Sequence, residues 1–200
     1  MRDAITVPDA RYHEKVYAPG EDRHLALALV NSRRNGPGEP VDELADAAGM
    51  VAWLRAHGLE DPEAGDAELA ALRTLRDAVR RLLMARIEGG APEREAVETV
   101  NAASAAAPTA PVLRWEPPDA PQAGRDPLGA GGATLARALV ATDAIALVTG
   151  PEQAGLHACG APGCIRLLLR DHPRRQWCST RCGDRVRASR YYHRHKASGE

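Results

Sequence analysis

The sequence contains no phenylalanine, and aromatic residues make up only 4% of its 200 residues. The 44% of hydrophobic residues must therefore come mainly from leucine, alanine and valine, a set that suits a helical core. The length suffices for one domain with a small appendage, or for two modest domains. No internal repeat is present, which excludes a solenoid.

Long uncharged apolar runs are also lacking. The best candidate, residues 133–149, is interrupted by Arg137 and Asp143 and falls short of the ~18 apolar residues that a membrane span needs. Residues 1–20 hold no apolar run of the signal-peptide type. We therefore expect no membrane span and a cytoplasmic location, where cysteines stay reduced and favour metal binding over disulfides.

Cysteine is absent before position 159, and all four cysteines lie in the C-terminal part as two close pairs. Cys159 and Cys164 are separated by four residues, and Cys178 and Cys182 by three. Two such pairs predict a tetrahedral four-thiolate zinc site. Two disulfides are the main alternative. A redox pair is disfavoured because neither pair has the two-residue spacing of thiol oxidoreductases.

A closed shell of four thiolates leaves no open coordination position, so we expect one structural zinc ion. A module of about forty residues cannot form an adequate core unaided, and the metal would supply much of its folding free energy. His157 and His172 lie nearby and are weaker candidates to replace a thiolate. Trp177 is most simply a core residue of this module, with base stacking as the alternative.

Charge of both signs is unevenly distributed. The formal net charge is −1, yet residues 157–200 contain ten Lys or Arg against three Asp or Glu. The preceding 156 residues contain 16 basic and 24 acidic residues. Such asymmetry is a recognised sign of nucleic-acid contact by the basic part, and it also allows the two parts to attract each other.

Apolar residues recur at three- and four-residue steps in the first 155 residues and predict an all-helical domain there. Pro108 to Gly132 breaks this pattern with six prolines, and residues 112–115 within it predict a short strand. Asn101 is expected on the inward face of its helix, and the last helix is expected to be largely buried. The expected helices cover residues 22–34, 41–57, 66–88, 92–106 and 134–149.

The cysteine-rich part predicts a knuckle, a β-hairpin and a helix. Residues 164–170 and 175–178 are the expected hairpin strands, and Ser179 is a suitable N-cap for a helix from Thr180 to about His195. The predicted fold class is mainly α, with a helical domain in residues 1–155 and a small treble-clef-like zinc module in residues 156–200.

The segment Trp177-Cys178-Ser179, followed by Cys182-Gly183-Asp184-Arg185, resembles the CGNR-type zinc finger. Asp184 stands where the family pattern has asparagine. Residues 25–33 (L-A-L-A-L-V-N-S-R), Trp53-Leu54 and residues 72–83 are similar to the ABATE-type helical domain. The resemblance implies a bacterial, stress-linked transcription regulator.

The helix expected after Ser179 is basic and carries two adjacent tyrosines. Arg187, Arg190 and Arg194 fall on one side of it, and guanidinium groups suit bidentate contacts with phosphate or guanine. Arg185, beside Cys182, is expected to brace the knuckle as well. The alternative is a basic face that docks on the acidic domain. The predicted nucleic-acid-binding residues are Arg181, Arg185, Arg187, Arg190, Tyr191, Arg194 and Lys196.

Polar side chains on the expected helices form a second candidate site, a pocket for a small-molecule effector. The alternative is that Asn31 satisfies backbone groups at the end of its helix and that the arginines are surface charges. The candidate effector residues are Asn31, Trp53, Arg73, Arg76 and Asn101.

No G-x-S-x-G, H-E-x-x-H, Walker or G-x-G-x-x-G motif is present, so we expect no enzyme. The leading interpretation is a DNA-binding transcription regulator with a structural zinc finger and a helical sensory or dimerisation domain. Its partners would be double-stranded DNA, a small-molecule effector and a second copy of the chain, because one finger covers little DNA. The alternative is a zinc-stabilised protein-interaction module that does not touch DNA.

Overall fold

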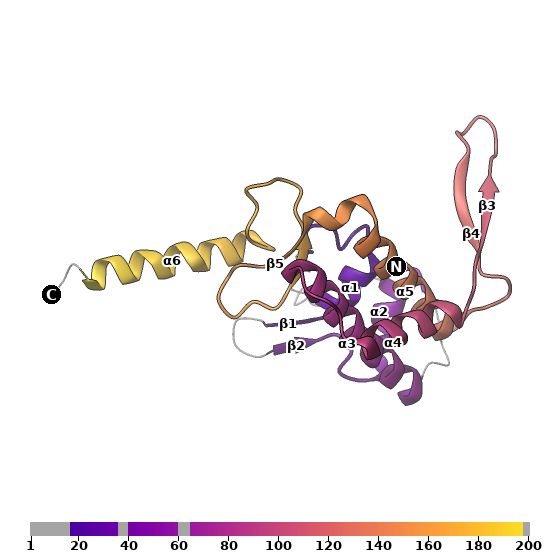
Figure 1. Cartoon of the computed structure of the whole chain (residues 1–200), viewed down its shortest axis with the longest axis horizontal. Helices are drawn as coiled ribbons and strands as arrows, with labels where there is room; N and C mark the ends of the chain where they lie inside the picture. Colours follow the sequence, from indigo (N-terminus) through magenta and orange to yellow (C-terminus); the bar gives the residue numbers. More distant parts are fainter. Residues whose placement is uncertain (1–16, 36–39, 60–64, 198–200) are drawn as a thin grey trace, which may run out of the picture.

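The structure is a computed structural model that describes residues 17–35, 40–59 and 65–197. We call its residues up to Gly155 the body and its residues from Leu156 the C-terminal module. A β-hairpin projects from one side of the body, and the last helix projects from the opposite side (Figure 1). The elements are α1 (Leu25–Asn31), β1 (Arg33–Asn35), β2 (Pro40–Asp42), α2 (Ala47–Ala56), α3 (Asp66–Glu88), α4 (Arg94–Ala105), β3 (Ala110–Arg114), β4 (Gln122–Asp126), α5 (Gly132–Thr149), a 3-10 turn (Pro151–Gly155), β5 (Leu156–Ala158), β6 (Leu167–Leu169) and α6 (Thr180–Ala197).

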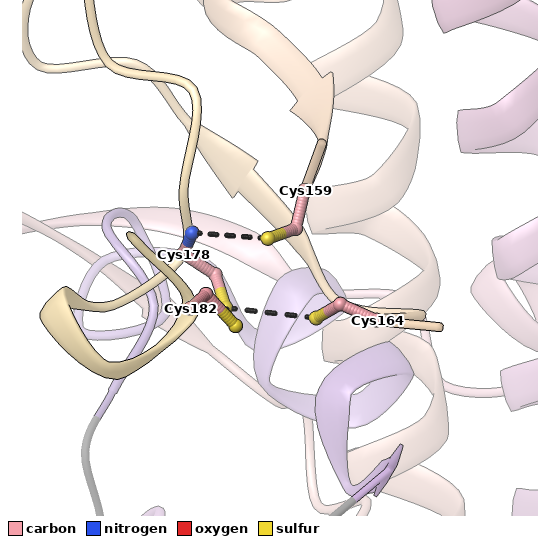
Figure 2. A group of neighbouring side chains, drawn as sticks. All are labelled: Cys159, Cys164, Cys178 and Cys182. Carbon is pink, nitrogen blue, oxygen red and sulfur yellow. Dashed lines mark hydrogen bonds between the residues drawn. The ribbon is translucent and has the colours of Figure 1, made fainter. Parts of the chain in front are cut away.

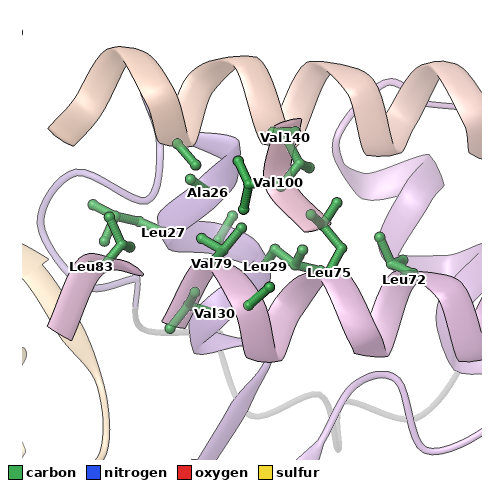
Figure 3. Packing of buried hydrophobic residues seen from close by; sticks show 14 of the residues in the cluster. Ala26, Leu27, Leu29, Val30, Leu72, Leu75, Val79, Leu83, Val100 and Val140 are labelled. Carbon is green, nitrogen blue, oxygen red and sulfur yellow. The ribbon is translucent and has the colours of Figure 1, made fainter. Parts of the chain in front are cut away.

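The core of the body is built mainly by α1, α3, α4 and α5: α5 contacts the other three helices, and α3 contacts α1 and α4. Helix α1 is enclosed, since every residue from Ala26 to Asn31 is buried. Burial of one leucine contributes ~1.5–3 kcal/mol relative to exposure, so a core of leucine, valine and alanine needs no phenylalanine. Figure 3 shows Leu27, Leu29 and Val30 of α1 facing Leu72, Leu75, Val79 and Leu83 of α3, with Val100 of α4 and Val140 of α5.

Helix α3 confirms the clearest periodicity of the sequence. It begins at Asp66, where the amide of Gly65 donates to the Glu68 carboxylate at 3.0 Å. It ends before Gly89, which adopts the left-handed conformation (φ 70°) that glycine favours at this position. The apolar stripe predicted for it faces the core.

The first two helices are shorter than expected. Helix α1 begins at Leu25 rather than at residue 22, and Asp143 of α5 caps it, since its carboxylate accepts from the amide of Ala26 at 2.8 Å. The strands β1 and β2 pair antiparallel, and they include residues 33–34 and 41–42, which were expected to be helical. Asp46 then caps α2 by accepting from the amide of Gly49 at 2.7 Å. Helix α2 therefore begins at Ala47, directly after its N-cap, rather than at residue 41.

Helix α4 begins at Arg94 rather than at Pro92, and Asn101 is exposed, so its expected inward position is wrong. Among the described residues, α5 is the one helix long and apolar enough to cross a membrane by length and composition. A core helix passes the same test, and α5 packs on α1, α3 and α4. Its burial in the body accounts for its composition.

The hairpin β3–β4 contains the short strand expected near residues 112–115. Its partner strand was not predicted from the sequence, because Gln122–Asp126 carries no apolar alternation. The two strands pair antiparallel, with Leu113 opposite Ala123. Leu113 and Trp115 are 68% and 60% exposed on this arm, so it adds nothing to the core.

The C-terminal module contains a hairpin and a helix, as expected, but its strands differ. Strand β6 pairs with β5, Leu156 lying opposite Leu169, and residues 175–178 form no strand. Leu156, Leu167 and Leu169 belong to the main core of the body. The amide of Leu169 also donates to the carbonyl of Pro19 at 2.8 Å. The module is therefore packed into the body.

Candidate metal centre and basic helix

The four cysteines come from the ends of short elements in the C-terminal module. Cys159 follows β5, Cys164 precedes β6 by two residues, and Cys178 and Cys182 lie on either side of the start of α6. The amide of Cys159 donates to the carbonyl of Arg166 at 2.9 Å, which closes the loop between the first pair. Ser179 caps α6 as expected, its hydroxyl accepting from the amide of Cys182 at 3.3 Å.

The four sulfur atoms all lie within 4.8 Å of one another (Figure 2). The Sγ atoms of Cys164 and Cys178 are 3.7 Å apart, and those of Cys178 and Cys182 are 3.6 Å apart. A zinc–sulfur bond of about 2.3 Å gives tetrahedron edges of about 3.8 Å, whereas a disulfide requires about 2.05 Å. All four cysteines are free, so the sulfurs have the spacing of a metal site.

The electrostatics of the cluster also favour a cation. Hydrogen bonds with Cys164 and Cys178 lower the pKa of Cys159. The hydrogen bond with Cys159 raises the pKa of Cys164 to about 11, and it raises the pKa of Cys178 too. The thiols thus share protons rather than ionise together, and a soft divalent cation replaces those protons when it binds four thiolates.

Neither candidate histidine belongs to this cluster of metal-binding groups in the described part of the chain. His157 lies in β5, and His172 accepts the amide hydrogen of Arg174 at 3.1 Å. Four thiolates are a ligand set that suits zinc, and a bound zinc ion would cross-link the two cysteine pairs.

Trp177 lies between two glycines that the sequence places directly after cysteines. A Cβ atom on Gly183 would lie 2.8 Å from Cδ1 of Trp177, and one on Gly160 would lie 3.2 Å from Cζ3. The indole therefore covers both backbone segments, within the small apolar cluster of the module. In the sequence, the dipeptide Cys-Gly occurs twice, as Cys159-Gly160 and Cys182-Gly183, and this repetition is the feature that could have pointed to the contact.

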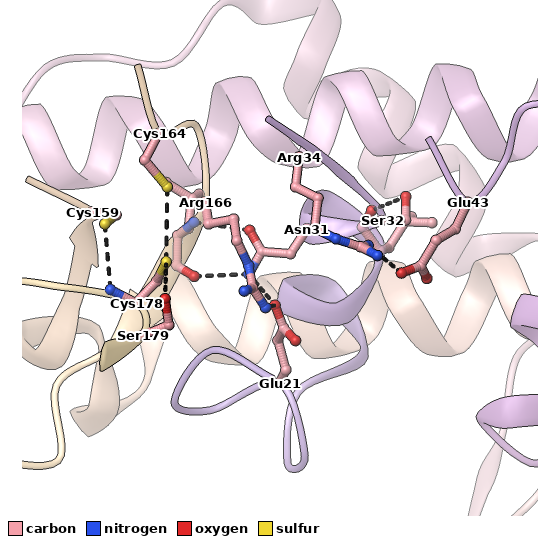
Figure 4. A network of polar contacts seen from close by, with 12 residues as sticks. Glu21, Asn31, Ser32, Arg34, Glu43, Cys159, Cys164, Arg166, Cys178 and Ser179 are labelled. Atoms are coloured by element: carbon pink, nitrogen blue, oxygen red, sulfur yellow. Dashed lines mark hydrogen bonds and ion pairs between the residues drawn. The ribbon is translucent and has the colours of Figure 1, made fainter. Parts of the chain in front are cut away.

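A buried polar network joins the body to the C-terminal module (Figure 4). Asn31 donates to the Glu21 carboxylate at 2.6 Å and to the carbonyl of Leu167 at 2.8 Å, and its amide oxygen accepts from the amide of Leu167 at 2.8 Å. Arg166 forms an ion pair with Glu21 at 2.8 Å. Neither Glu21 nor Arg166 could be predicted from the sequence, because nothing local shows that positions 145 residues apart meet.

Arg185 lies where the sequence predicted a brace, with Nη2 3.9 Å from the sulfur of Cys182. Val186 is buried at the base of α6, and the helix then extends away from the body (Figure 1). Arg187 pairs with Asp184 at 2.5 Å, so Asp184 offsets one of the positive charges.

The structure brings most of the predicted nucleic-acid-binding residues to one surface. Arg187, Arg190, Tyr191 and Arg194 line one shallow hollow along α6. A second hollow at the foot of the helix includes Arg187 again. Arg181 and Arg185 are exposed but line neither hollow, and the side chain of Lys196 lies outside the described part. The second hollow is lined by Asp171, His172, Arg174, Arg175, Gln176, Trp177, Ser179, Thr180, Gly183 and Arg187.

The five candidate effector residues are not brought together. Asn31 bonds to the C-terminal module, and Asn101 is exposed on α4. Trp53 packs on His57, with ring centroids 4.2 Å apart. Arg73 donates to two backbone carbonyls before α2, which fixes that loop.

Arg76 is no surface charge either, because only 4% of it is exposed. It forms hydrogen bonds with both carboxylate oxygens of Asp42 and with the hydroxyl of Ser32. Arg73 and Arg76 thus stabilise loops of the body, and Asn31 stabilises the contact of the body with the C-terminal module.

Two family models match the chain. The ABATE family, described as "Putative stress-induced transcription regulator", matches residues 23–151. The CGNR zinc finger matches residues 156–195, and its cysteine cluster forms one zinc site. No curated protein matches the chain. Since the first match covers more than half of the chain, this protein belongs to the ABATE family and carries a CGNR zinc finger after the ABATE domain.

Proposed function

We propose that this protein regulates transcription by placing α6 directly against duplex DNA. The observation that carries this proposal is the projection of α6 from the body (Figure 1), with Arg187, Arg190, Tyr191 and Arg194 along one hollow of its surface. A helix of 18 residues is about 27 Å long, and the major groove of B-DNA, about 12 Å wide, admits an α-helix.

The charge of this surface supports the same partner. Arg174 extends the basic surface from α6 onto the loop before it, because it lines the hollow that shares Arg187, whereas Arg175 in the same hollow pairs with Asp171 at 2.6 Å. Guanidinium groups match phosphate oxygens in bidentate geometry. Docking of this face on the acidic body, the alternative explanation, is disfavoured by the direction of α6 (Figure 1).

The zinc ion would support DNA binding only indirectly. It fixes the start of α6 through Cys178 and Cys182 and touches no DNA in this proposal. A single finger gives a small footprint, so we propose that a homodimer binds specific sites and that the body supplies the dimer contact. The protein would act in the cytoplasm. No effector site is proposed, since the candidate residues are dispersed.

Binding to duplex DNA at a series of salt concentrations tests the proposal. The logarithm of the affinity should fall with the logarithm of salt by about 0.9 per phosphate contact. Replacement of Arg187, Arg190 and Arg194 by alanine should reduce this slope by about three contacts' worth.

A matched control removes the same charge from the body, through alanine at the exposed positions Arg55, Arg86 and Arg94. This control should leave the slope nearly unchanged. If the parent and both triple variants behaved alike at every salt concentration, the protein-interaction alternative would replace DNA binding.

A further inference from the structure

The zinc site carries a charge that the surrounding protein must balance. Four thiolates and one Zn²⁺ sum to two negative charges, and Cys159 and Cys178 are buried. A buried charge is costly unless it is paired or hydrogen-bonded. Groups around the ligands therefore influence how tightly the metal is held.

Arg166 is the most deeply buried cation near the cluster. It lies two residues after Cys164, and its side chain is only 9% exposed. Figure 4 shows Arg166 between the cysteines and Glu21. A guanidinium stays protonated in proteins, so Arg166 is a positive charge beside the sulfurs, and its backbone carbonyl also accepts from the amide of Cys159 at 2.9 Å.

The body holds this guanidinium in place. The side chain of Glu21 is 1% exposed and accepts from Arg166 at 2.8 Å. Asn31 of α1 donates to the same carboxylate oxygen and clamps Leu167, the next residue of the module, by two backbone hydrogen bonds. These hydrogen bonds fix the carboxylate, the amide and one end of the guanidinium in one arrangement, while Nε of Arg166 is buried without a hydrogen-bond partner.

Two other arginines lie near the sulfurs, and neither is equivalent. Arg80 of α3 donates to the carbonyl of Ile165 at 2.7 Å, and its pKa is lowered, mainly by burial. Arg185 reaches Cys182 from the exposed side of α6, where water screens its charge. Arg166 combines burial, charge and a fixed position.

We propose that the ABATE body sets the zinc affinity of the finger: Arg166 balances part of the charge on the four thiolates, and Glu21 and Asn31 position its guanidinium. The zinc finger is then a metal site shared with the body rather than a self-contained module. This inference rests on the metal centre and is independent of DNA binding.

Zinc affinity of the full chain, measured by competition with a chromophoric chelator, tests the proposal. The clean comparison is Glu21→Gln with Glu21→Gln/Arg166→Gln, since both lack the carboxylate and differ only in the arginine. The double variant should hold zinc about 10- to 100-fold more weakly, the usual effect of a group that supports metal ligands. The control Glu21→Gln/Arg181→Gln removes an exposed arginine of equal charge and should stay close to Glu21→Gln.

Conservative replacement separates charge from structure. Glu21→Gln/Arg166→Lys keeps the positive charge and should recover most of the lost zinc affinity, whereas a purely structural role would give the same loss with lysine as with glutamine. If the glutamine double variant fails to fold, Glu21→Met/Arg166→Met offers an apolar pair of similar length for the comparison. Equal zinc affinity in the Arg166 and Arg181 double variants would overturn the proposal.

Discussion

At the scale of single residues, close contacts explain several identities in the C-terminal module. Trp177 covers Gly160 and Gly183, each of which directly follows a zinc-binding cysteine. In a helix interior, alanine is normally more favourable than glycine by about 1 kcal/mol. Gly183 is an exception because the indole occupies the space that a side chain would need.

Gly183→Ala is therefore expected to destabilise the protein by about 1–3 kcal/mol, the usual effect of overpacking, despite the gain in helix propensity. Denaturant unfolding of the zinc-loaded protein measures this change. Gly90→Ala is the matched control, because a Cβ atom there meets nothing within 4 Å. A Gly183→Ala variant as stable as the control would show that Trp177 moves aside without cost.

Asp42 and Arg76 give a stability that depends on pH. Burial raises the pKa of Asp42, but hydrogen bonds from Arg76 and Leu44 together with the charges of Arg76 and Arg73 outweigh burial, and the net pKa lies below the usual 3.8. A carboxyl whose pKa is lowered by folding contributes stability above its unfolded pKa and loses it as the pH falls through the folded pKa. Asp42→Asn should cost about 1–3 kcal/mol at pH 7 and progressively less below pH ~4. Unfolding curves at both pH values test this, and an equal loss at both would contradict it.

At the scale of secondary structure, elements with a strong local pattern could be predicted and those fixed by distant contacts could not. Helix α3 and the cap at Ser179 follow from periodicity and capping chemistry within their own segments. The start of α1 depends on Asp143, more than 100 residues away. Strand β5 was missed because its partner β6 lies beyond the loop that carries the first cysteine pair.

The same distinction applies to the metal centre and its surroundings. The four ligands were predictable because close pairs of cysteines are a local signal. The ion pair of Glu21 with Arg166 was not, since it depends on how the chain folds back on itself. The surroundings of the candidate effector residues could not be predicted for the same reason, because polar residues on separate helices meet only where packing brings them together.

Asp143 tests the contribution of a cap supplied by another helix. Its carboxylate accepts from the amide of Ala26 at 2.8 Å and from His24 at 2.9 Å, at the first turn of α1. Asp143→Ala should lower the free energy of unfolding by about 1–2 kcal/mol, as loss of an N-cap does. Asp77→Ala, on the exposed side of α3, is the control and should change little. Faster amide exchange in α1 would locate the effect.

At the scale of the whole molecule, the body and the zinc finger share one hydrophobic core. Three leucines of the finger, Leu156, Leu167 and Leu169, complete the core of the body. Asn35 and Arg80 of the body donate to the carbonyls of Gly163 and Ile165, on either side of Cys164. The sequence predicts two domains, residues 1–155 and 156–200, and these contacts join the two parts.

Removal of zinc should therefore weaken the body as well as the finger. Because the loop that carries Cys164 also anchors β6, loss of the ion frees Leu167 and Leu169 to leave the core. Leu167→Ala is expected to cost about 2–5 kcal/mol with zinc bound, which sets the scale of this contribution. Thermal unfolding followed by helical circular dichroism should shift down by several degrees with excess chelator, since each kcal/mol corresponds to about 2–4 °C in a chain of this size.

Readdition of zinc should restore the parent curve. A variant with all four cysteines replaced by serine is the control, and chelator should leave its unfolding temperature unchanged. The contrary outcome is that chelator lowers the midpoint temperature of a minor transition only, with the helices of the body unfolding at the same temperature as in the parent. That outcome would show that the body is independent of the metal.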